Sequence, residues 1–440
     1  GCRATHQRSR TQEKAVMSKT AQHTIEVWAD WIGLGRATFM GTLSAARSRG
    51  KEIFSFEYDE GWLARAPAQS LDPSLGLYGG AQYAPSDRDN FRVFLDSCPD
   101  RWGRVLMTRR EAQLARSEGR KERKLLESDF LLGVHDSHRM GALRFRATKD
   151  GPFLDDNQDM ASPPWTSLRK LEQVSLALER DDSEDDPDYA QWLRMLIAPG
   201  GSLGGARPKA SVLDDNGALW IAKFPSRRDD DDVGAWEGVI HELAKRVGIE
   251  TATAQARKFG SDHHTFLAKR FDRNPDGSRV HFASAITLLQ RSDGDDASSG
   301  ASYLELAELI MKSGSQTDRD LEELWRRIVF SICVSNTDDH LRNHGFLLGP
   351  SGWALAPAYD MNPNPQGAGL KLNISETDNA QDLQLVREVA GFFRIQDARA
   401  TAIIDGVAAA VRQWRAVAKK YGITRDEQAR MAPAFEHAGW

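Results

Sequence analysis

The sequence predicts an α+β fold in which a strand-rich first half precedes a helix-rich second half. Residues 23–66 alternate apolar and polar side chains between glycines, which is typical of short strands. A second strand-rich stretch, 200–225, carries an Asn-Gly turn between two apolar runs, a strong hairpin signal. Beyond about residue 300 the spacing of apolar residues becomes helical, over 302–313, 317–334, 383–393 and 397–420.

The overall composition limits the class of protein. The chain has 440 residues, of which 40% are hydrophobic and 28% charged, which suits two or three domains with real cores. Its net charge of -5 provides no general attraction to nucleic acid or anionic membrane. Three scattered cysteines without a CxxC pair argue against a zinc ribbon or a disulfide scaffold and fit a reducing cytosol. No apolar run is long enough to predict a membrane span.

Composition also suggests four segments. Residues 1–22 are polar and basic without an apolar signal region, so we expect a disordered or added tail. Residues 23–148 should form a small strand-rich subdomain, with short strands arranged as in a small barrel. Residues 149–270 begin with an acidic, proline-containing stretch that favours a boundary, and they contain the hairpin. Residues 271–440 should form the helical part.

Further elements are expected between these signals. Residues 229–248 form an amphipathic pattern that starts at an aspartate cluster, as helix N-termini favour. The remaining expected elements are helices within 86–130 and over 166–179, and strands over 140–147 and 264–273.

A glycine-rich loop precedes the predicted hairpin. Glycines here would let backbone N–H groups converge on an anion, although a plain flexible turn is an equally good interpretation. The GxxxxGK[ST] phosphate-binding pattern is absent. Residues 209 and 223 flank the two strands and therefore lie at the open end of the hairpin, beside the loop. The glycines are Gly200, Gly201, Gly204 and Gly205, with Ser202 between them.

Lys223 stands on an otherwise apolar strand, WIAKFP. A lysine in that position is either solvent-facing or buried with a partner, because buried lysines are rare unless paired. Glu237 lies on the apolar face of the helix predicted next, where a carboxylate needs a cation unless it reaches water at the edge of that face. Together they would reproduce the strand lysine and helix glutamate that orient ATP phosphates in protein kinases.

The polar cluster SNTDDHLRNH, residues 335–344, follows a long apolar helix and precedes a second predicted hairpin. Asp338 and Asn343 have the D-x-x-x-x-N spacing of a phosphotransferase catalytic loop. Asn343 precedes the first strand of that hairpin and Asp360 follows the second, so pairing brings both to one end, next to Asp338. We therefore expect Asp338 to accept the proton of a substrate hydroxyl, and Asn343 and Asp360 to hold Mg²⁺.

Two other interpretations of this cluster stay open. His340 and His344 are four apart, as in helical metal sites, so a metal-dependent hydrolase using them with Asp338 is an alternative. The intervening residues do not look helical and no HExxH pattern supplies a base, so we favour a structural role in which His340 braces the loop by hydrogen bonds. Asp339 has the ordinary interpretation of a turn or cap residue.

The order of these features along the chain is that of a protein-kinase-like, two-lobed fold. Several stretches of the sequence resemble those of the HipA family, the kinase toxins of bacterial type II toxin–antitoxin systems. The matching stretches include DSCPDRWGR (96–104), GGSLGGARPKAS (200–211), FLAKRFDR (266–273), SNTDDHLRNH (335–344) and LAPAYDMNP (355–363). Arg207 departs from the glutamine of many members.

The resemblance implies a serine/threonine protein kinase that uses ATP and Mg²⁺, with a small N-terminal subdomain on a two-lobed kinase. By position Asp338 matches the catalytic aspartate, Ser202 the autophosphorylated serine, and the strand end around Lys269 the segment that meets adenine. Phosphate on Ser202 would add negative charge to a phosphate-binding loop and oppose ATP binding. The nucleotide-binding residues we expect are Ser202, Gly204, Gly205, Ala206, Lys209, Lys223, Glu237, Lys269 and His340.

The resemblance also implies partners. These are a small HipB-like helix-turn-helix antitoxin and a protein substrate such as an aminoacyl-tRNA synthetase, with DNA contacted only through the antitoxin and no role for a membrane. A weakly catalytic regulator that acts with the antitoxin on operator DNA is an alternative, suggested by basic residues such as Arg101, Arg104, Arg109 and Arg110.

Overall fold

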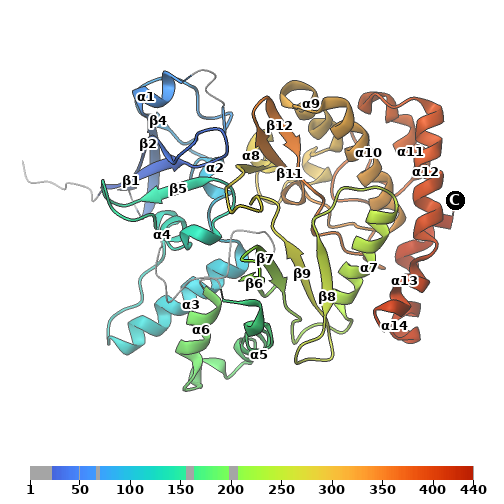
Figure 1. Cartoon of the computed structure of the whole chain (residues 1–440), viewed down its shortest axis with the longest axis horizontal. Coiled ribbons are helices and arrows are strands. Elements are labelled where there is room, and N and C mark those ends of the chain that lie inside the picture. Colours follow the sequence, from blue (N-terminus) through green and yellow to red (C-terminus); the bar gives the residue numbers. More distant parts are fainter. Residues whose placement is uncertain (1–21, 49, 66–69, 155–162, 198–206, 440) are drawn as a thin grey trace, which may run out of the picture.

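The computed structural model describes residues 22–48, 50–65, 70–154, 163–197 and 207–439. The α+β class is confirmed: three sheets and many helices follow one another from the N-terminal sheet at one end of the body to the C-terminal helices at the other (Figure 1). Within these ranges, no helix combines the length and the apolar character needed to cross a membrane. The predicted tail, residues 1–22, lies almost wholly outside the described residues.

The N-terminal sheet has the strand order β4-β3-β2-β1-β5. The expected barrel is wrong, because the sheet ends at β4, a strand of two residues that does not pair with β5. Alternate residues of these strands, such as Leu43 and Phe56, point into the core. The strands are β1 (Gln22–Ala29), β2 (Thr38–Ser48), β3 (Lys51–Tyr58), β4 (Gln82–Tyr83) and β5 (Leu143–Arg146). The helices of this region are α1 (Glu60–Leu63), α2 (Arg92–Leu95), α3 (Arg101–Ser117) and α4 (Glu127–Leu132).

The second sheet, ordered β6-β7-β9-β8, contains the hairpin predicted from the Asn-Gly turn. Asp214 forms this turn by accepting hydrogen bonds from the N–H groups of Asn216 and Ala218, and Gly217 adopts a φ of 76° that favours glycine. The strands are β6 (Lys209–Leu213), β7 (Leu219–Lys223), β8 (Ala254–Arg257) and β9 (Thr265–Lys269). The accompanying helices are α5 (Leu168–Leu178), α6 (Tyr189–Ile197) and α7 (Val233–Arg246).

The third sheet, ordered β10-β11-β12, carries the second predicted hairpin, and its strand β12 contacts the helices α9 and α10. The single helix expected over 397–420 is two helices, because Gln413 N–H donates to the carbonyl of Ala410, three residues back, where α12 ends. The strands are β10 (Phe282–Ser284), β11 (Gly345–Gly349) and β12 (Gly352–Leu355). The helices are α8 (Ala285–Leu289), α9 (Tyr303–Ser313), α10 (Thr317–Cys333), α11 (Leu383–Glu388), α12 (Asp397–Val411), α13 (Trp414–Lys420) and α14 (Arg425–Met431).

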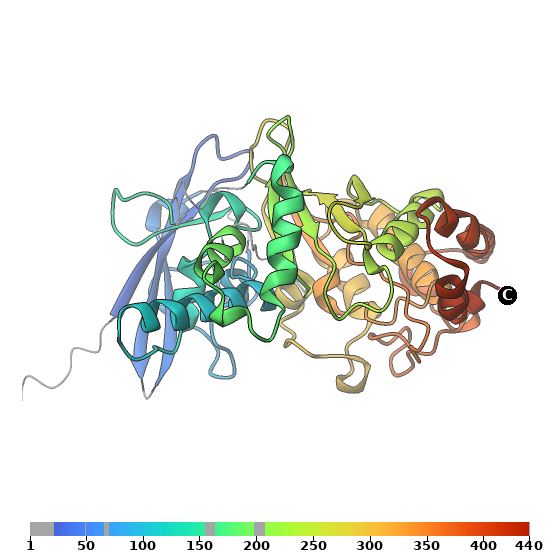
Figure 2. The same ribbon diagram turned by 90° about the horizontal axis from the view of Figure 1, so that it is seen from below.

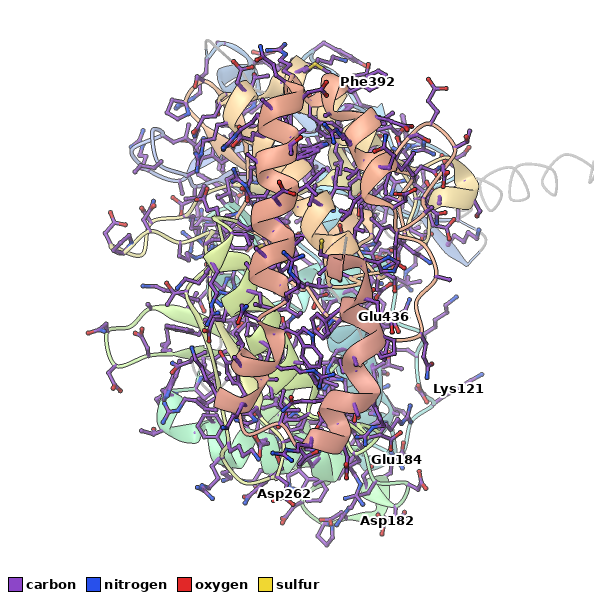
Figure 3. All side chains as sticks on the ribbon, turned by 90° about the vertical axis from the view of Figure 1, so that its right-hand side faces the viewer. Lys121, Asp182, Glu184, Asp262, Phe392 and Glu436 are labelled. Atoms are coloured by element: carbon purple, nitrogen blue, oxygen red, sulfur yellow. The ribbon has the colours of Figure 1, made fainter. Side chains whose placement is uncertain are left out.

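Packing joins these parts. Helix α3, from the N-terminal region, places Trp102 and Leu106 in the same apolar cluster as the residues of β6, β7 and β9. Helices α3, α5 and α6 lie together at the lower edge in Figure 1, and they face the viewer when the molecule is seen from below (Figure 2). The C-terminal helices cover the opposite end, where Phe392 is exposed (Figure 3). The domain limits given by the sequence stay a prediction.

Candidate active site

A cleft with a volume of about 950 Å³ lies between the second and third sheets, beside loops and helices of the N-terminal region. Strands β7 and β9 line one side with Lys223 and Ala268, and the stretch after α10 lines the other with Asp338. Residues 96–104 of the N-terminal region close a third side. This volume falls in the size range of small-molecule and cofactor sites.

Lys223, Glu237 and Asp360 form the electrostatic centre of this cleft. The Lys223 ammonium donates hydrogen bonds to Glu237 Oε1 at 2.6 Å and to Asp360 Oδ1 at 2.5 Å. The three side chains come from β7, from α7 and from the segment after β12. Lys223 thus contacts Glu237, the partner that the sequence predicted, and it also contacts Asp360. Glu237 is 5% exposed, on the helix face where the sequence predicted it.

The titration of this group follows from its contacts. Burial by itself would lower the pKa of Lys223, but Asp360 and Glu237 outweigh burial and raise it. Burial by itself would raise the pKa of Asp360, but attraction to Lys223 lowers it to about 2. Burial is the largest effect on Glu237, and it raises the pKa of that carboxyl. Lys223 and Asp360 therefore carry opposite charges at neutral pH.

The stretch after α10 forms a compact loop around Asp338 and Asn343. The Asn343 side-chain amide donates to the backbone carbonyl of Asp338 at 3.1 Å, and the His340 N–H donates to the same carbonyl at 2.9 Å. The Tyr359 hydroxyl donates to the carbonyl of Arg342 at 2.6 Å, which ties this loop to the segment that carries Asp360. Asp338 is exposed in the cleft.

Asp339 and His344 were not recognised as a pair from the sequence. Asp339 is not a surface turn residue: it is 5% exposed and accepts a hydrogen bond from the Tyr303 hydroxyl at 2.7 Å. His344 Nε2 lies 3.0 Å from its other oxygen, an ion-pair distance. Burial would raise the pKa of Asp339, but the contacts with His344 and Tyr303 lower it. The sequence contained a signal for this pair, because Asp339 and His344 are five positions apart, as are Asp338 and Asn343.

The other predicted histidine and lysines are placed as follows. His340 borders the cleft, but within the described part of the chain its Nδ1 is buried without a hydrogen-bond partner, so the expected bracing through that atom is not seen. Lys269 lines the cleft at the end of β9. Lys209 is 2% exposed and donates to Asp100, the N-cap of α3, at 2.9 Å. Ser202, Gly204, Gly205 and Ala206 lie outside the described residues, as do Gly200 and Gly201.

Asn343 and Asp360 fit a Mg²⁺ ion by their chemistry. Both offer hard oxygen donors, and the lowered pKa of Asp360 keeps its carboxylate charged at neutral pH. Within the described ranges, no group of three or more His, Cys, Asp or Glu side chains is arranged so that it could hold a metal ion. Magnesium bound with a nucleotide needs only one or two such ligands, because phosphate and water oxygens complete its shell.

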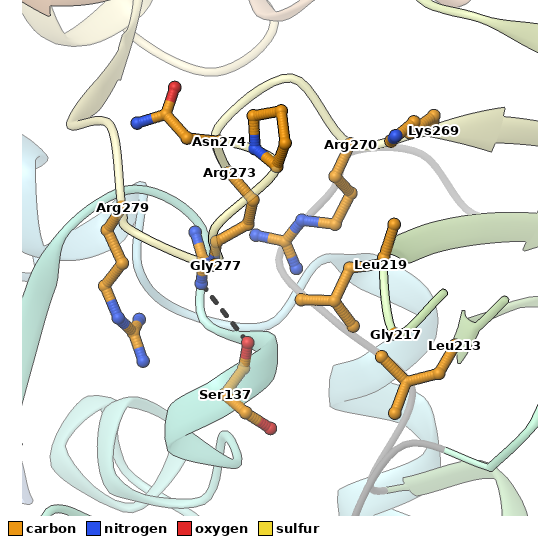
Figure 4. A pocket seen from close by; sticks show the side chains of 12 residues that line it. Ser137, Leu213, Gly217, Leu219, Lys269, Arg270, Arg273, Asn274, Gly277 and Arg279 are labelled. Atoms are coloured by element: carbon orange, nitrogen blue, oxygen red, sulfur yellow. Dashed lines mark hydrogen bonds between the residues drawn. The ribbon is translucent and has the colours of Figure 1, made fainter. Parts of the chain in front are cut away.

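A smaller pocket of about 300 Å³ lies beside the turn of the first hairpin and is lined by Arg270, Arg273 and Arg279 (Figure 4). The guanidinium groups of Arg270 and Arg273 are engaged within the chain, because both pair with Asp272. Arg273 also donates hydrogen bonds to the carbonyls of Ser137 and Arg139. These contacts fasten the N-terminal region to the segment after β9. The pocket is therefore not the candidate active site.

Comparison with known proteins gives one family and several relatives. The family model described as a HipA-like C-terminal domain matches residues 201–414. The chain is 28% identical over 212 residues to "Putative kinase Y4dM" of Sinorhizobium fredii, covering 42% of this chain and 50% of that one. It is 28% identical over 143 residues to "Putative kinase" of Haemophilus influenzae, covering 30% and 42%. The chain thus spans half or less of the length of these two relatives.

One solved structure is similar over almost the whole chain. It is a chain of the Shewanella oneidensis complex of HipA, HipB and its operator DNA, with a TM-score of 0.63 and 18% identity. The superposition covers 94% of this chain and 95% of that chain. At this identity the likeness shows the fold, and it confirms the predicted two-lobed, kinase-like architecture with a strand-rich N-terminal region.

Proposed function

We propose, from the premise that residues 201–414 belong to the HipA-like C-terminal domain family, that this protein is an ATP-dependent serine/threonine protein kinase. The observation that carries the proposal is the contact of Lys223 with both Glu237 and Asp360, in a cleft that Asp338 also lines. This set joins a strand lysine, a helix glutamate and two loop aspartates, which is what phosphoryl transfer needs.

Each residue then has a distinct task. Lys223, oriented by Glu237, binds phosphate oxygens of ATP, while Lys269 and the end of β9 border the part of the cleft that receives adenine. Asp338, exposed at the mouth, accepts the proton of the substrate hydroxyl as that oxygen bonds to the γ-phosphorus and the bond to ADP breaks. Asn343 and Asp360 would hold Mg²⁺, which neutralises phosphate charge when bound.

The family premise extends the proposal to regulation and partners. We expect a toxin of the HipA type, restrained by a HipB-like antitoxin that contacts operator DNA, and acting in the bacterial cytoplasm. A component of translation such as an aminoacyl-tRNA synthetase is the proposed substrate. Ser202 is the proposed site of autophosphorylation, and its phosphate would oppose ATP binding in the same loop.

Two of the four basic residues that suggested the regulatory alternative are engaged within the chain, whereas Arg101 and Arg110 are exposed. Arg104 pairs with Glu127 at 2.7 Å, and Arg109 donates to the carbonyl of Leu178 at 2.8 Å. Their charges and donors are thus used within the chain, which leaves them less suited to phosphate contacts.

The deciding experiment incubates the protein with γ-labelled ATP and Mg²⁺, alone and with bacterial lysate. Label on the parent that is lost in Asp338→Asn supports a kinase, and a fall in Ser202→Ala identifies the autophosphorylation site. The Asp338 residue is exposed, so Asp338→Asn should keep the parent's thermal midpoint. No label on parent protein, shown by mass to be unphosphorylated, would overturn the proposal.

A further inference from the structure

A buried three-residue contact lies directly behind the proposed catalytic loop. Asp339 occupies its centre, between the Tyr303 hydroxyl at 2.7 Å and His344 Nε2 at 3.0 Å. Tyr303 and His344 also meet edge to face, with ring centroids 5.8 Å apart. All three residues are at most 5% exposed, so we expect them to support the loop rather than to contact a substrate.

The position of this contact in the chain is what gives it a role. Asp339 immediately follows Asp338, and His344 immediately follows Asn343. The contact between Asp339 and His344 therefore joins the two ends of the loop, each one residue after a proposed catalytic residue. Tyr303 is the first residue of α9, whose N-cap Ser302 makes a capping box with Glu305, so the hydroxyl is presented from a fixed element.

Each end of the loop is thus anchored in the core by Asp339 or His344, while the preceding residue, Asp338 or Asn343, stays available for the proposed reaction. Asp339 points inward and Asp338 is exposed in the cleft. The backbone carbonyl of His344 accepts the N–H of Ala285, which fastens that end to α8. A shift of Asp339 would move the Asp338 carbonyl, and with it the Asn343 amide that donates to it.

We propose that Asp339, held by Tyr303 and His344, is the positioning residue that sets the separation and orientation of Asp338 and Asn343. The inference rests on the proposed kinase function for its catalytic consequence, but the anchoring of the loop is a property of the fold. Misplacing a reacting group by about 1 Å costs on the order of 100-fold in rate. Positioning without substrate contact should therefore appear in kcat rather than in the KM for ATP.

The test compares Asp339→Asn and Tyr303→Phe with Tyr189→Phe. The control removes an equally buried hydroxyl, on α6, that has no hydrogen-bond partner within the described ranges. We expect kcat to fall by about 10- to 100-fold in the first two variants with the KM for ATP little changed. The double variant should fall by less than the product of the single effects, because both substitutions break one contact.

Hydrogen exchange supplies a readout that does not depend on activity. Amides of residues 336–343 should exchange faster in Asp339→Asn and Tyr303→Phe than in the control, while those of β6 and β7 stay unchanged. Equal exchange in all variants would overturn the proposal, and so would a uniform loss of protection across the C-terminal region, which indicates a purely structural role. If the parent transfers no phosphate, the proposed function fails, but the exchange comparison still decides the positioning role.

Discussion

Lys223 Nζ lies 2.5 Å from Asp360 Oδ1, although the two residues are 137 positions apart. The same ammonium group contacts Glu237, so one cation holds together the first hairpin, helix α7 and the segment after the second hairpin. The contact matters for stability as well as for the proposed chemistry. Removing either charge leaves an uncompensated partner in a buried or half-buried place.

Lys223→Met should abolish phosphotransfer and lower the free energy of unfolding by about 3 kcal/mol, because Glu237 and Asp360 lose their shared cation. Urea denaturation and labelled-ATP assays measure the two effects. Lys223→Met/Glu237→Gln should regain part of the stability but none of the activity. A Lys223→Met variant as active as the parent would contradict the assignment of this lysine.

The pH dependence of stability should carry a contribution from Asp360. Attraction to Lys223 lowers the pKa of Asp360 from 3.8 to about 2 in the folded protein. The unfolded state therefore binds the proton first, so this contribution is complete above about pH 4 and is lost as the pH falls toward 2. Glu237, whose pKa burial raises, titrates in the opposite sense.

The measurement is urea denaturation from pH 5 to pH 2 for the parent and for Asp360→Asn. The variant should lose less stability over the acidic window because it lacks the titrating carboxyl, while Glu237 is present in both proteins. Asp405→Asn, on the exposed side of α12, is the control and should follow the parent. Parallel curves for the parent and Asp360→Asn would refute the contribution.

Asp272→Asn should destabilise the protein strongly. Asp272 is 0% exposed, and it pairs with Arg270 at 2.5 Å and with Arg273 at 2.7 Å. Its loss leaves two largely buried guanidinium groups without their carboxylate, at a cost of about 3–5 kcal/mol in the free energy of unfolding. Asp276→Asn, in the exposed turn that follows, should change little. Similar denaturation midpoints for the two variants would show that the arginines find other partners.

Gly352→Ala should weaken the hairpin that carries Asn343 and Asp360 at its ends. Gly352 has a φ of 135°, and an added Cβ would lie 2.7 Å from the carbonyl oxygen of Ser313. The expected loss is about 1–3 kcal/mol in the free energy of unfolding, with lower phosphotransfer. Gly406→Ala, exposed within α12 with no atom within 4 Å of the new Cβ, should instead be stabilising by up to about 1 kcal/mol. An unchanged thermal midpoint for Gly352→Ala would contradict the strain argument.

The elements that the sequence predicted well are those with a local signal. The hairpin at Asn216 and Gly217 follows from turn chemistry, and α10 from its apolar spacing. The contact of Lys223 with Glu237 could also be foreseen, since each is a charge on an apolar face that needs the other. The roles assigned to Asp338, Asn343 and Asp360 stay proposals, although the structure brings their segments to one cleft.

The failures share a cause. The sequence did not reveal that Lys209 pairs with Asp100, more than a hundred positions earlier, at the start of a helix that packs on the hairpin. The expected contact of Lys209 with nucleotide stays a prediction. The N-terminal strands were expected to close as a barrel, yet local alternation does not decide which strands lie at an edge. Asp339 was read as a turn residue because its partner Tyr303 lies on another helix.

From the sequence alone we could predict long helices such as α7 and α10, the two hairpins, the pairing of Lys223 with Glu237, and the resemblance to a kinase family. These features depend on hydrophobic periodicity, on turn residues and on charged residues that lie on apolar faces, all of which are local properties of the sequence. The contacts of Asp360 with Lys223, of Asp100 with Lys209, and of Asp339 with Tyr303 and His344 became visible only in the folded molecule. Those contacts join side chains from separate elements, and their energies depend on burial that no single segment of the chain specifies.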